Sequence, residues 1–325
     1  MRKSKLRFAV TLAVMFGLVP LLSFSQEEPY IVPSPVKLTM KSRFVDQTFE
    51  IHVQLPVSLA DGSERFPVLY MTDCVGGIIF DDITALLQMG GDIPRFITVG
   101  IGYPAENWMA GTILRGRDLT PTKFEPPQME IVWPVRGITK IEKGKKTGGA
   151  AEFLRFLREE LQPYIDANYP TIPGDRGYFG DSLGGLFGLY VMFNEPDSFT
   201  RYIIGSPSSW WDDEVIMQQA KDFASSGKPL NARVFIAAGA LEEQGAEAAK
   251  FRMVTNVYRI EKMLRSAEIK GLQLSTFSFP NETHTSVVAM NYIRGVQTVY
   301  DRPALPFLQD YMMKQMKEAP AKDKK

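Results

Sequence analysis

Short apolar runs alternate along this chain with longer segments of helical periodicity. Most of the apolar runs are nearly continuous, which is typical of strands buried on both faces of a sheet. In the longer segments apolar residues recur every three or four positions, which predicts helices with one buried face. The expected strands are 36–44, 49–55, 66–72, 95–103, 177–179, 201–205, 232–238 and 272–279, and the expected helices are 80–89, 150–169, 183–193, 213–224, 246–267 and 286–299.

The order of these elements predicts an α/β fold. Strands that alternate with helices form a mostly parallel sheet with helices on both faces. The first two strands flank a short polar turn at 45–47, so we expect them to form an antiparallel hairpin at one edge of the sheet. In the second of these strands His52 alternates with core residues, and its side chain is therefore expected to point to solvent.

The pattern indicates one domain over residues 26–312. No internal repeat or linker divides it, but the stretch 104–149 holds five prolines and little periodicity. A loop of that length in a compact domain is usually a lid or a binding segment, and a surface insertion is the alternative. The polar and charged residues 313–325 are expected to form a frayed tail.

The first 25 residues have the pattern of a signal peptide. Four basic residues in 1–7 precede the apolar run 8–22, and the small residues Ser23 and Ser25 follow it. An apolar run of about 15 residues is short for a membrane span. We expect cleavage after Ser25 and an exported protein, periplasmic or secreted, without a stable membrane span; an uncleaved anchor is the alternative.

Composition and charge narrow the classes of partner. The chain has 37 basic and 37 acidic residues, so it carries no electrostatic footprint for nucleic acid. One cysteine excludes a disulfide framework within the chain, and two histidines exclude a centre built from several histidines. We therefore expect no metal and no cofactor, and a small-molecule substrate as the partner.

A candidate nucleophile lies where an apolar strand meets an apolar helix. Residues 180–184 (GDSLG) match G-x-S-x-G, with the expected strand 177–179 before them and the expected helix 183–193 after them. Such a strand–turn–helix is the context of a nucleophile elbow, in which the serine hydroxyl projects from a sharp turn. The alternative is a glycine-rich turn without chemistry. The context favours Ser182 as a nucleophile.

A serine nucleophile requires a base and usually an orienting acid. His284 lies in a polar loop after the last expected strand, and the order Ser, acid, His along the chain is that of α/β hydrolases. Glu242 and Glu243 both follow the strand 232–238, and either could orient the imidazole. An acidic residue is also favoured at a helix N-terminus, a reading that fits Glu243 better than Glu242.

Six segments that occur in one order carry a resemblance to a known family. Together they resemble the esterase family of α/β hydrolases that includes esterase D-like and enterochelin-esterase-like members, over about residues 36–299. The segments are 70–73 (YMTD), 117–121 (RDLTP), 153–165 (from FL to PYI), 180–187 (GDSLGGLF), 206–211 (SPSSWW) and 283–286 (THTS).

The resemblance implies roles for particular residues. It implies Ser182 as nucleophile, His284 as base and Glu242 as acid, with an oxyanion hole from the backbone N–H groups of Leu183 and Val75. The chain departs from the family at two positions. Cys74 stands where a glycine is usual, and Asp181 stands before the nucleophile where a histidine is frequent.

The resulting expectation is an exported serine carboxylic-ester hydrolase that works through an acyl-enzyme. An acyltransferase using the same intermediate is an alternative, and so is a non-catalytic binding protein on the same scaffold. A siderophore ester, a carbohydrate-linked ester and a simple acyl ester all remain open as substrates. The candidate substrate-binding residues are Trp210, Trp211, Ser209, Arg117 and Trp108.

Overall fold

The computed structural model describes residues 35–56, 64–72, 80–104, 114–124 and 147–303 of the 325-residue chain. All of them lie in one compact unit, residues 32–325. The expected signal peptide, most of the loop 104–149 and the tail 313–325 lie outside the described residues. Among the described helices none combines the length and the hydropathy that a membrane crossing requires.

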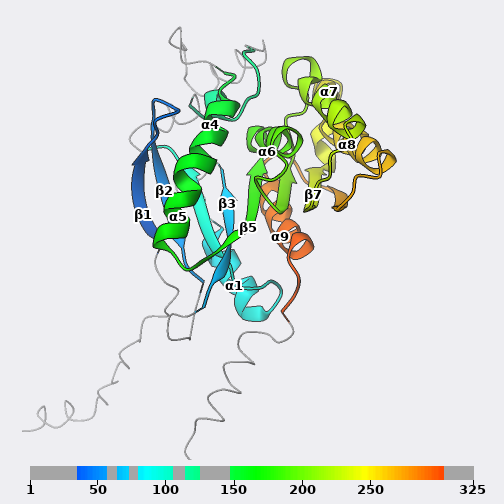
Figure 1. Cartoon of the computed structure of the whole chain (residues 1–325). Helices are drawn as coiled ribbons and strands as arrows, with labels where there is room; N and C mark the ends of the chain where they lie inside the picture. Colours follow the sequence, from blue (N-terminus) through cyan, green and yellow to red (C-terminus); the bar gives the residue numbers. More distant parts are fainter. Residues whose placement is uncertain (1–34, 57–63, 73–79, 105–113, 125–146, 304–325) are drawn as a thin grey trace, which may run out of the picture. The chain divides into compact units, whose positions relative to one another are not determined.

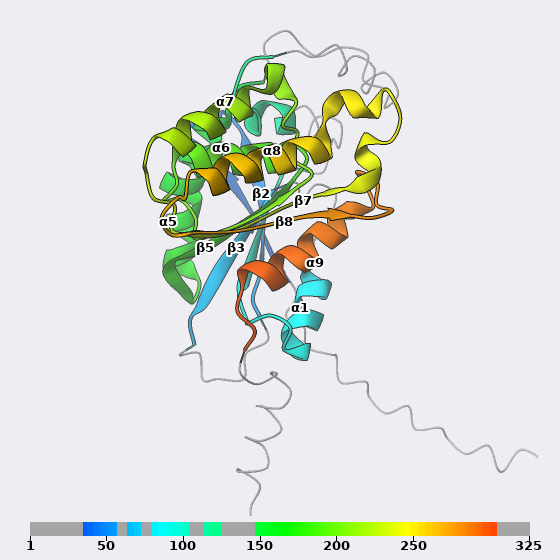
Figure 2. The same cartoon turned by 90° about the vertical axis from the view of Figure 1, so that its right-hand side faces the viewer.

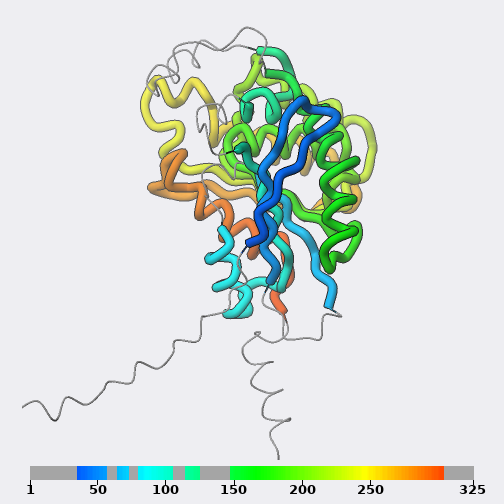
Figure 3. Tube along the Cα trace, turned by 90° about the vertical axis from the view of Figure 1, so that its left-hand side faces the viewer, coloured from blue at the N-terminus to red at the C-terminus, as the bar shows by residue number. Residues whose placement is uncertain are grey.

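The described strands form one sheet in the order β1-β2-β4-β3-β5-β6-β7-β8. The first two strands form the expected antiparallel hairpin, β2 pairs antiparallel with β4, and all other neighbours are parallel. Figure 3 looks onto the edge that carries this hairpin. The strands are β1 (Val36–Lys41), β2 (Thr48–Gln54), β3 (Phe66–Met71), β4 (Ile97–Gly102), β5 (Thr171–Asp181), β6 (Arg201–Gly205), β7 (Ala232–Gly239) and β8 (Leu272–Phe279).

Helices cover both faces of the sheet, as Figures 1 and 2 show. One face carries α4 (Ala150–Phe156), which continues through a π-helical turn (Leu157–Leu161) into α5 (Gln162–Asn168), and then α6 (Leu183–Asn194), α7 (Trp211–Ser225) and α8 (Met253–Ser266). The other face carries α1 (Asp81–Gly90) and α9 (Val287–Val299). The expected α/β-hydrolase architecture is confirmed.

The central strands bury side chains on both faces, as their continuous apolar runs predict. In β3, Val68 and Tyr70 pack into the core under α4 to α8, while Leu69 and Met71 pack into the core under α1 and α9. Burial of apolar area of this kind is the main favourable contribution to folding. The two cores hold the carboxyl ends of β5, β6 and β7 in fixed register, with Asp181 opposite Gly205 and Gly205 opposite Ala237.

Three expectations about local structure are corrected. The strand expected at 177–179 begins at Thr171. The helix expected at 246–267 begins at Met253, because residues 248–251 form a separate 3-10 turn and Arg252 has a left-handed φ of 50°. His52 does not face open solvent: its side chain is 11% exposed and binds Glu50, because β1 lies outside β2.

Candidate active site

Ser182 occupies the sharp turn between β5 and α6. Its backbone has a φ of 59° and a ψ of −116°, a conformation that non-glycine residues rarely adopt. A Cβ atom at Gly180 would lie 2.5 Å from the carbonyl oxygen of Gly184, so the turn requires a residue without a side chain there. Leu183 is the first residue of α6, where a backbone N–H has no partner within the helix. The turn has the geometry of a nucleophile elbow.

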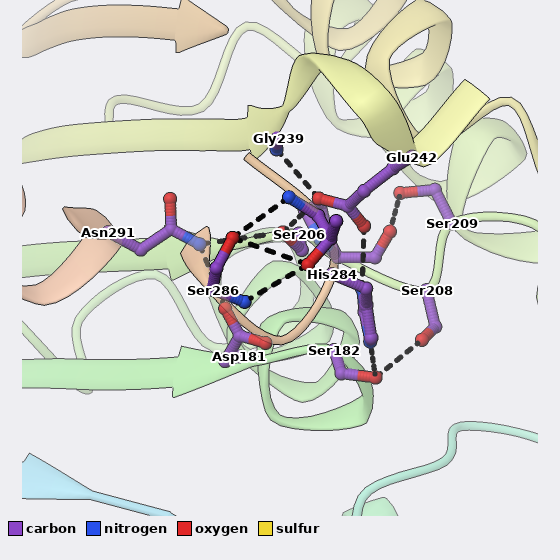
Figure 4. Close-up of polar contacts among 12 residues, drawn as sticks. Asp181, Ser182, Ser206, Ser208, Ser209, Gly239, Glu242, His284, Ser286 and Asn291 are labelled. Carbon is purple, nitrogen blue, oxygen red and sulfur yellow. Dashed lines mark hydrogen bonds and ion pairs between the residues drawn. The ribbon is translucent and has the colours of Figure 1, made fainter. Parts of the chain in front are cut away.

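His284 lies between Ser182 and Glu242, and hydrogen bonds join the three side chains (Figure 4). Its Nε2 atom is 3.0 Å from Ser182 Oγ, and its Nδ1 atom is 2.6 Å from Glu242 Oε2. An ionised carboxylate only accepts hydrogen bonds, so Nδ1 carries the ring proton and Nε2 is free to accept one. This tautomer is the one in which histidine can take the proton of the Ser182 hydroxyl.

Three donors hold the Glu242 carboxylate. Besides the bond to His284, its Oε1 atom accepts hydrogen bonds from Ser206 Oγ at 2.7 Å and from the Gly239 N–H at 2.6 Å. Burial by itself raises the pKa of this carboxyl, which is 8% exposed, but the hydrogen bonds from His284, Ser206 and Gly239 outweigh burial and leave the pKa below its usual value. Glu242 is therefore charged and fixed in direction.

The neighbouring carboxylate turns away from the imidazole. Glu243 accepts hydrogen bonds from the backbone N–H of Thr255 at 2.6 Å and from its hydroxyl at 2.9 Å. Thr255 lies in the first turn of α8, so Glu243 binds a helix N-terminus. Of the two carboxylates that the sequence offers at this strand end, only Glu242 contacts His284.

Exchange of each carboxylate for an amide is expected to separate their roles. Glu242→Gln should lower kcat by about two to four orders of magnitude, because an amide can stabilise neither the correct tautomer nor the charged imidazolium. Glu243→Gln should lower kcat by less than about tenfold and act mainly on stability. Steady-state kinetics of both variants, with circular dichroism as a check on folding, measures the difference; a larger loss in Glu243→Gln would contradict the assignment.

The ionisation of His284 sets an expected pH dependence. Burial by itself lowers the pKa of His284, but the hydrogen bond to Glu242 and the negative charges of Asp181 and Glu242 outweigh both burial and the opposing charge of Arg115. The pKa is thus raised above its ordinary value of about 6.5. Below the raised pKa the imidazole is protonated and cannot accept the proton of Ser182.

We therefore expect kcat/KM to fall as the pH falls through a midpoint above about 6.5. A pH profile of kcat/KM for a neutral ester measures this limb without ionisation of the substrate. In Glu242→Gln the hydrogen bond that raises the pKa is lost, so the limb of any residual activity should move to lower pH. An acidic limb well below pH 6 in the wild-type protein would contradict the expected role of His284.

The candidate substrate-binding residues differ in their surroundings. Trp210 is half-buried, packs against Phe251 and lines an open pocket of about 510 Å³. Trp211 is fully buried and donates its indole N–H to Thr122, and Ser209 is also buried. Arg117 forms two hydrogen bonds with the fully buried carboxylate of Asp118. Trp108 and the expected oxyanion donor Val75 lie outside the described residues.

Several polar residues to which the sequence analysis assigned no role lie at the site. The Ser208 hydroxyl is 3.4 Å from Ser182 Oγ, and Arg115 donates to the backbone carbonyl of Asp181 at 3.0 Å. Ser206 holds Glu242, and Asn291 of α9 contacts Ser206 and Asp181. The only sequence signal for Asn291 is a polar residue on an apolar stripe, four positions from Val287 and from Gly295.

The described part of the chain contains no group of three or more His, Cys, Asp and Glu side chains arranged to hold a metal ion. The polar side chains that surround Ser182 are bonded to one another, and among them His284 has the greatest access to solvent, with 48% of its side chain exposed. The chemistry that this arrangement supports is proton transfer from a serine hydroxyl to an imidazole, followed by attack on a carbonyl carbon.

Comparison with known proteins supports the class of enzyme and the resemblance to the esterase family. Residues 128–285 match the family described as "Putative esterase". The ferri-bacillibactin esterase BesA of Bacillus subtilis is 29% identical over 278 residues, which are 82% of this chain and 90% of that protein. A siderophore triacetylfusarinine C esterase of Aspergillus fumigatus is 26% identical over 300 residues, with coverages of 83% and 96%.

A solved structure agrees with these relatives. The structure of the BES protein from Bacillus cereus has a TM-score of 0.68 and 26% identity, and the match covers 83% of this chain and 96% of that one. The protein is a serine carboxylic-ester hydrolase with the α/β-hydrolase fold. Its relatives and the matching family model support an esterase of the enterochelin-esterase-like type, and the resemblance inferred from its motifs is confirmed.

Proposed function

We propose that this protein is an exported siderophore esterase that hydrolyses its substrate through an acyl-enzyme on Ser182. The observation that carries the mechanism is the hydrogen-bonded chain from Ser182 through His284 to Glu242. The substrate class is supported by the relatives, whose names specify a ferri-bacillibactin esterase and a triacetylfusarinine C esterase. The expected signal peptide supports export.

In the first half of the reaction Ser182 Oγ attacks the ester carbonyl carbon while His284 Nε2 accepts the hydroxyl proton. The negative charge that develops on the carbonyl oxygen is stabilised by backbone N–H donors at the elbow, of which Leu183 is one. Glu242 stabilises the imidazolium that forms. When the tetrahedral intermediate collapses, His284 delivers the proton to the departing alcohol oxygen, and the acyl group remains on Ser182.

In the second half a water molecule releases the acyl group. His284 removes a proton from water, the hydroxide oxygen bonds to the acyl carbon, and Ser182 Oγ leaves and regains its proton from His284. The side chain of His284 is 48% exposed, so bulk water has access to the base. This exposure favours hydrolysis over transfer of the acyl group to another alcohol, for which a dry acceptor site is required.

The surroundings of the nucleophile suit a bulky ester. Ser208 lies beside Ser182, and Trp210, two residues further along the chain, lines the pocket of about 510 Å³. Lys250 and Arg252 line this pocket together with Asp213 and Glu214, so the formal charges of its lining balance. The pocket has room for a large portion of a substrate whose ester bond lies at Ser182.

The experiment that tests the proposal compares kcat/KM on three classes of ester. We expect the siderophore esters named for the relatives, bacillibactin and triacetylfusarinine C, to exceed p-nitrophenyl butyrate and a feruloyl ester by at least about a hundredfold, because remote binding contributes to transition-state stabilisation. Mass spectrometry in ¹⁸O-labelled water should find one label in the acid product. Higher kcat/KM on a simple ester would contradict the substrate class and leave the mechanism in place.

Export has a separate test. The protein isolated from the cells that make it should be found outside the cytoplasm and should begin at Gln26. An N-terminus at Met1 in the membrane fraction would favour the uncleaved anchor. The alternative of a non-catalytic binding protein predicts a folded wild-type chain that does not react with a fluorophosphonate.

A further inference from the structure

Asn291 is a fully buried amide on α9, the helix that follows the His284 loop. Its Nδ2 group donates to Asp181 Oδ1 at 2.9 Å and lies 3.4 Å from Ser206 Oγ (Figure 4). Because an ionised carboxylate can only accept, the nitrogen and not the oxygen of the amide must face Asp181. The orientation of the Asn291 side chain is therefore determined by its partner.

The other end of the amide has no comparable partner. Asn291 Oδ1 is buried without a hydrogen bond among the described residues. A buried polar atom without a partner is unfavourable, and the neighbouring buried positions of α9 on either side are apolar, for example Val287 and Val296. An apolar residue would therefore pack more favourably at this position. The presence of an asparagine indicates that the hydrogen bonds donated by its N–H group have a function.

The two contacts of Asn291 lead to opposite ends of the hydrogen-bonded chain. Asp181 is the residue immediately before the nucleophile Ser182, on β5. Ser206 follows β6 and donates to Glu242, which in turn holds His284. We propose that Asn291 is a positioning residue, which ties the strand that carries the nucleophile to the serine that holds the orienting acid.

The space around this link leaves little freedom for its members. Gly205, which pairs with Asp181 across β5 and β6, lies against both groups. A Cβ atom at Gly205 would be 2.3 Å from Asp181 Oδ1 and 2.5 Å from Asn291 Nδ2. The backbone therefore packs directly on the hydrogen bond between Asp181 and Asn291, and a displacement of Asn291 is transmitted to the residue before Ser182.

The contact between Asn291 and Asp181 also affects the pKa of His284, through the charge of Asp181. Among the described residues, the charged groups that act on His284 are Glu242 after β7, Asp181 on β5 and Arg115 in the helical segment 114–118. The negative charge of Asp181 raises the pKa of His284. The hydrogen bond from Asn291 fixes the position of the Asp181 carboxylate and therefore of that charge relative to the imidazole.

The test replaces Asn291 by leucine, which keeps the branched shape and the number of heavy atoms and removes the N–H group. Asn291→Leu should lower kcat by about 10- to 100-fold with little change in KM, because the reacting groups lose their alignment. The acidic limb of kcat/KM should move to lower pH, because Ser206 and Glu242 lose their alignment and the hydrogen bond to Glu242 is the main contact that raises the pKa of His284. The rate of fluorophosphonate labelling at Ser182 should fall in parallel.

A matched control variant distinguishes a loss of alignment of the reacting groups from a loss of stability. Asn256 is a second fully buried asparagine, on α8, and its amide donates to Glu214 at 3.2 Å. Asn256→Leu should lower the Tm as Asn291→Leu does but leave the pH profile where it is. Asn291→Leu with wild-type kcat and an unmoved acidic limb, and only a lower Tm, would overturn the proposal.

Asn291→Asp is a second variant that keeps the shape if leucine prevents folding. A protonated carboxyl at this position can donate to Asp181 as the amide does, whereas an ionised one repels it. We expect the kcat of this variant to match that of the wild-type protein at the same pH where the new carboxyl is protonated, and to fall below it as the pH rises, which adds an alkaline limb that the wild-type protein lacks. A profile without this limb, at wild-type kcat, would also overturn the proposal.

The inference rests on the proposed function, and its failure can be told apart from failure of that function. A wild-type protein that hydrolyses esters and reacts at Ser182, with Asn291 variants that match it in kcat and pH profile, contradicts only the role of Asn291. A folded wild-type protein that neither reacts with a fluorophosphonate nor hydrolyses any ester contradicts both.

Discussion

Ser182→Ala should abolish ester hydrolysis and covalent labelling while leaving the fold intact. The substitution removes only the Oγ atom that lies 3.0 Å from His284 Nε2, and alanine keeps the Cβ atom, so the backbone of the elbow is not disturbed. The expected loss of kcat is about six orders of magnitude, since the acyl-enzyme cannot form. Reaction with a fluorophosphonate, followed by mass spectrometry of the labelled peptide, locates the adduct on the wild-type protein.

Ser198→Ala is the matched control for this prediction. Ser198 is also buried, at 4% exposed, but it lies before β6, at the opposite end of the strand from Ser206. This variant should be labelled and active at nearly the wild-type rate. An adduct that maps to a residue other than Ser182, or full activity in Ser182→Ala, would contradict the proposed mechanism.

His284→Ala is expected to lower kcat by about three to six orders of magnitude. Without the imidazole, the described part of the chain leaves only the weakly basic Ser208 hydroxyl, at 3.4 Å, beside the Ser182 hydroxyl, and a neutral serine is a poor nucleophile. Glu242 would also lose the partner that it orients. Single-turnover kinetics with a chromogenic ester measures this loss at the acylation step, and Tm measurements check that the variant is folded.

The second histidine of the chain is the natural control. His52 lies on β2, where its ring binds Glu50 at 2.7 Å, and Lys37 of β1 binds the other oxygen of the same carboxylate at 2.7 Å. His52→Ala should change kcat by less than about threefold, although the loss of this contact can lower the Tm. If His52→Ala removed activity and His284→Ala did not, the assignment of the base would be wrong.

Much of the fold was predictable because it depends on local patterns. The strand and helix periodicities, the hairpin at 36–55 and the strand–turn–helix around Ser182 each involve neighbouring residues along the chain. Where the prediction of local structure was wrong, the packing of the folded chain determined the structure instead. His52 is covered because a further strand lies outside β2, and α8 begins at Met253 because Arg252 interrupts the helix with a positive φ.

Some residues of the candidate site could likewise be predicted from the sequence, and others could not. Ser182 and His284 could be selected from the sequence, since the motif has a recognisable turn and only two histidines exist. The roles of Ser206 and Asn291 could not, because the motif 206–211 does not show which serine contacts the acid, and an asparagine within a helix has no distinctive local pattern. Their contacts join residues 36 and 85 positions apart and exist only after β6 and α9 have packed.

By itself the sequence determined the order of the elements and the elbow at Ser182, because turn chemistry and hydrophobic periodicity act over a few residues. The tertiary structure decided which of Glu242 and Glu243 contacts His284. The two carboxylates are adjacent in the chain, but Glu242 points to His284, whereas Glu243 binds the N-terminus of α8. The physical reason is that direction depends on partners 42 and 12 residues away, which only the packed sheet and helices bring to the same strand end.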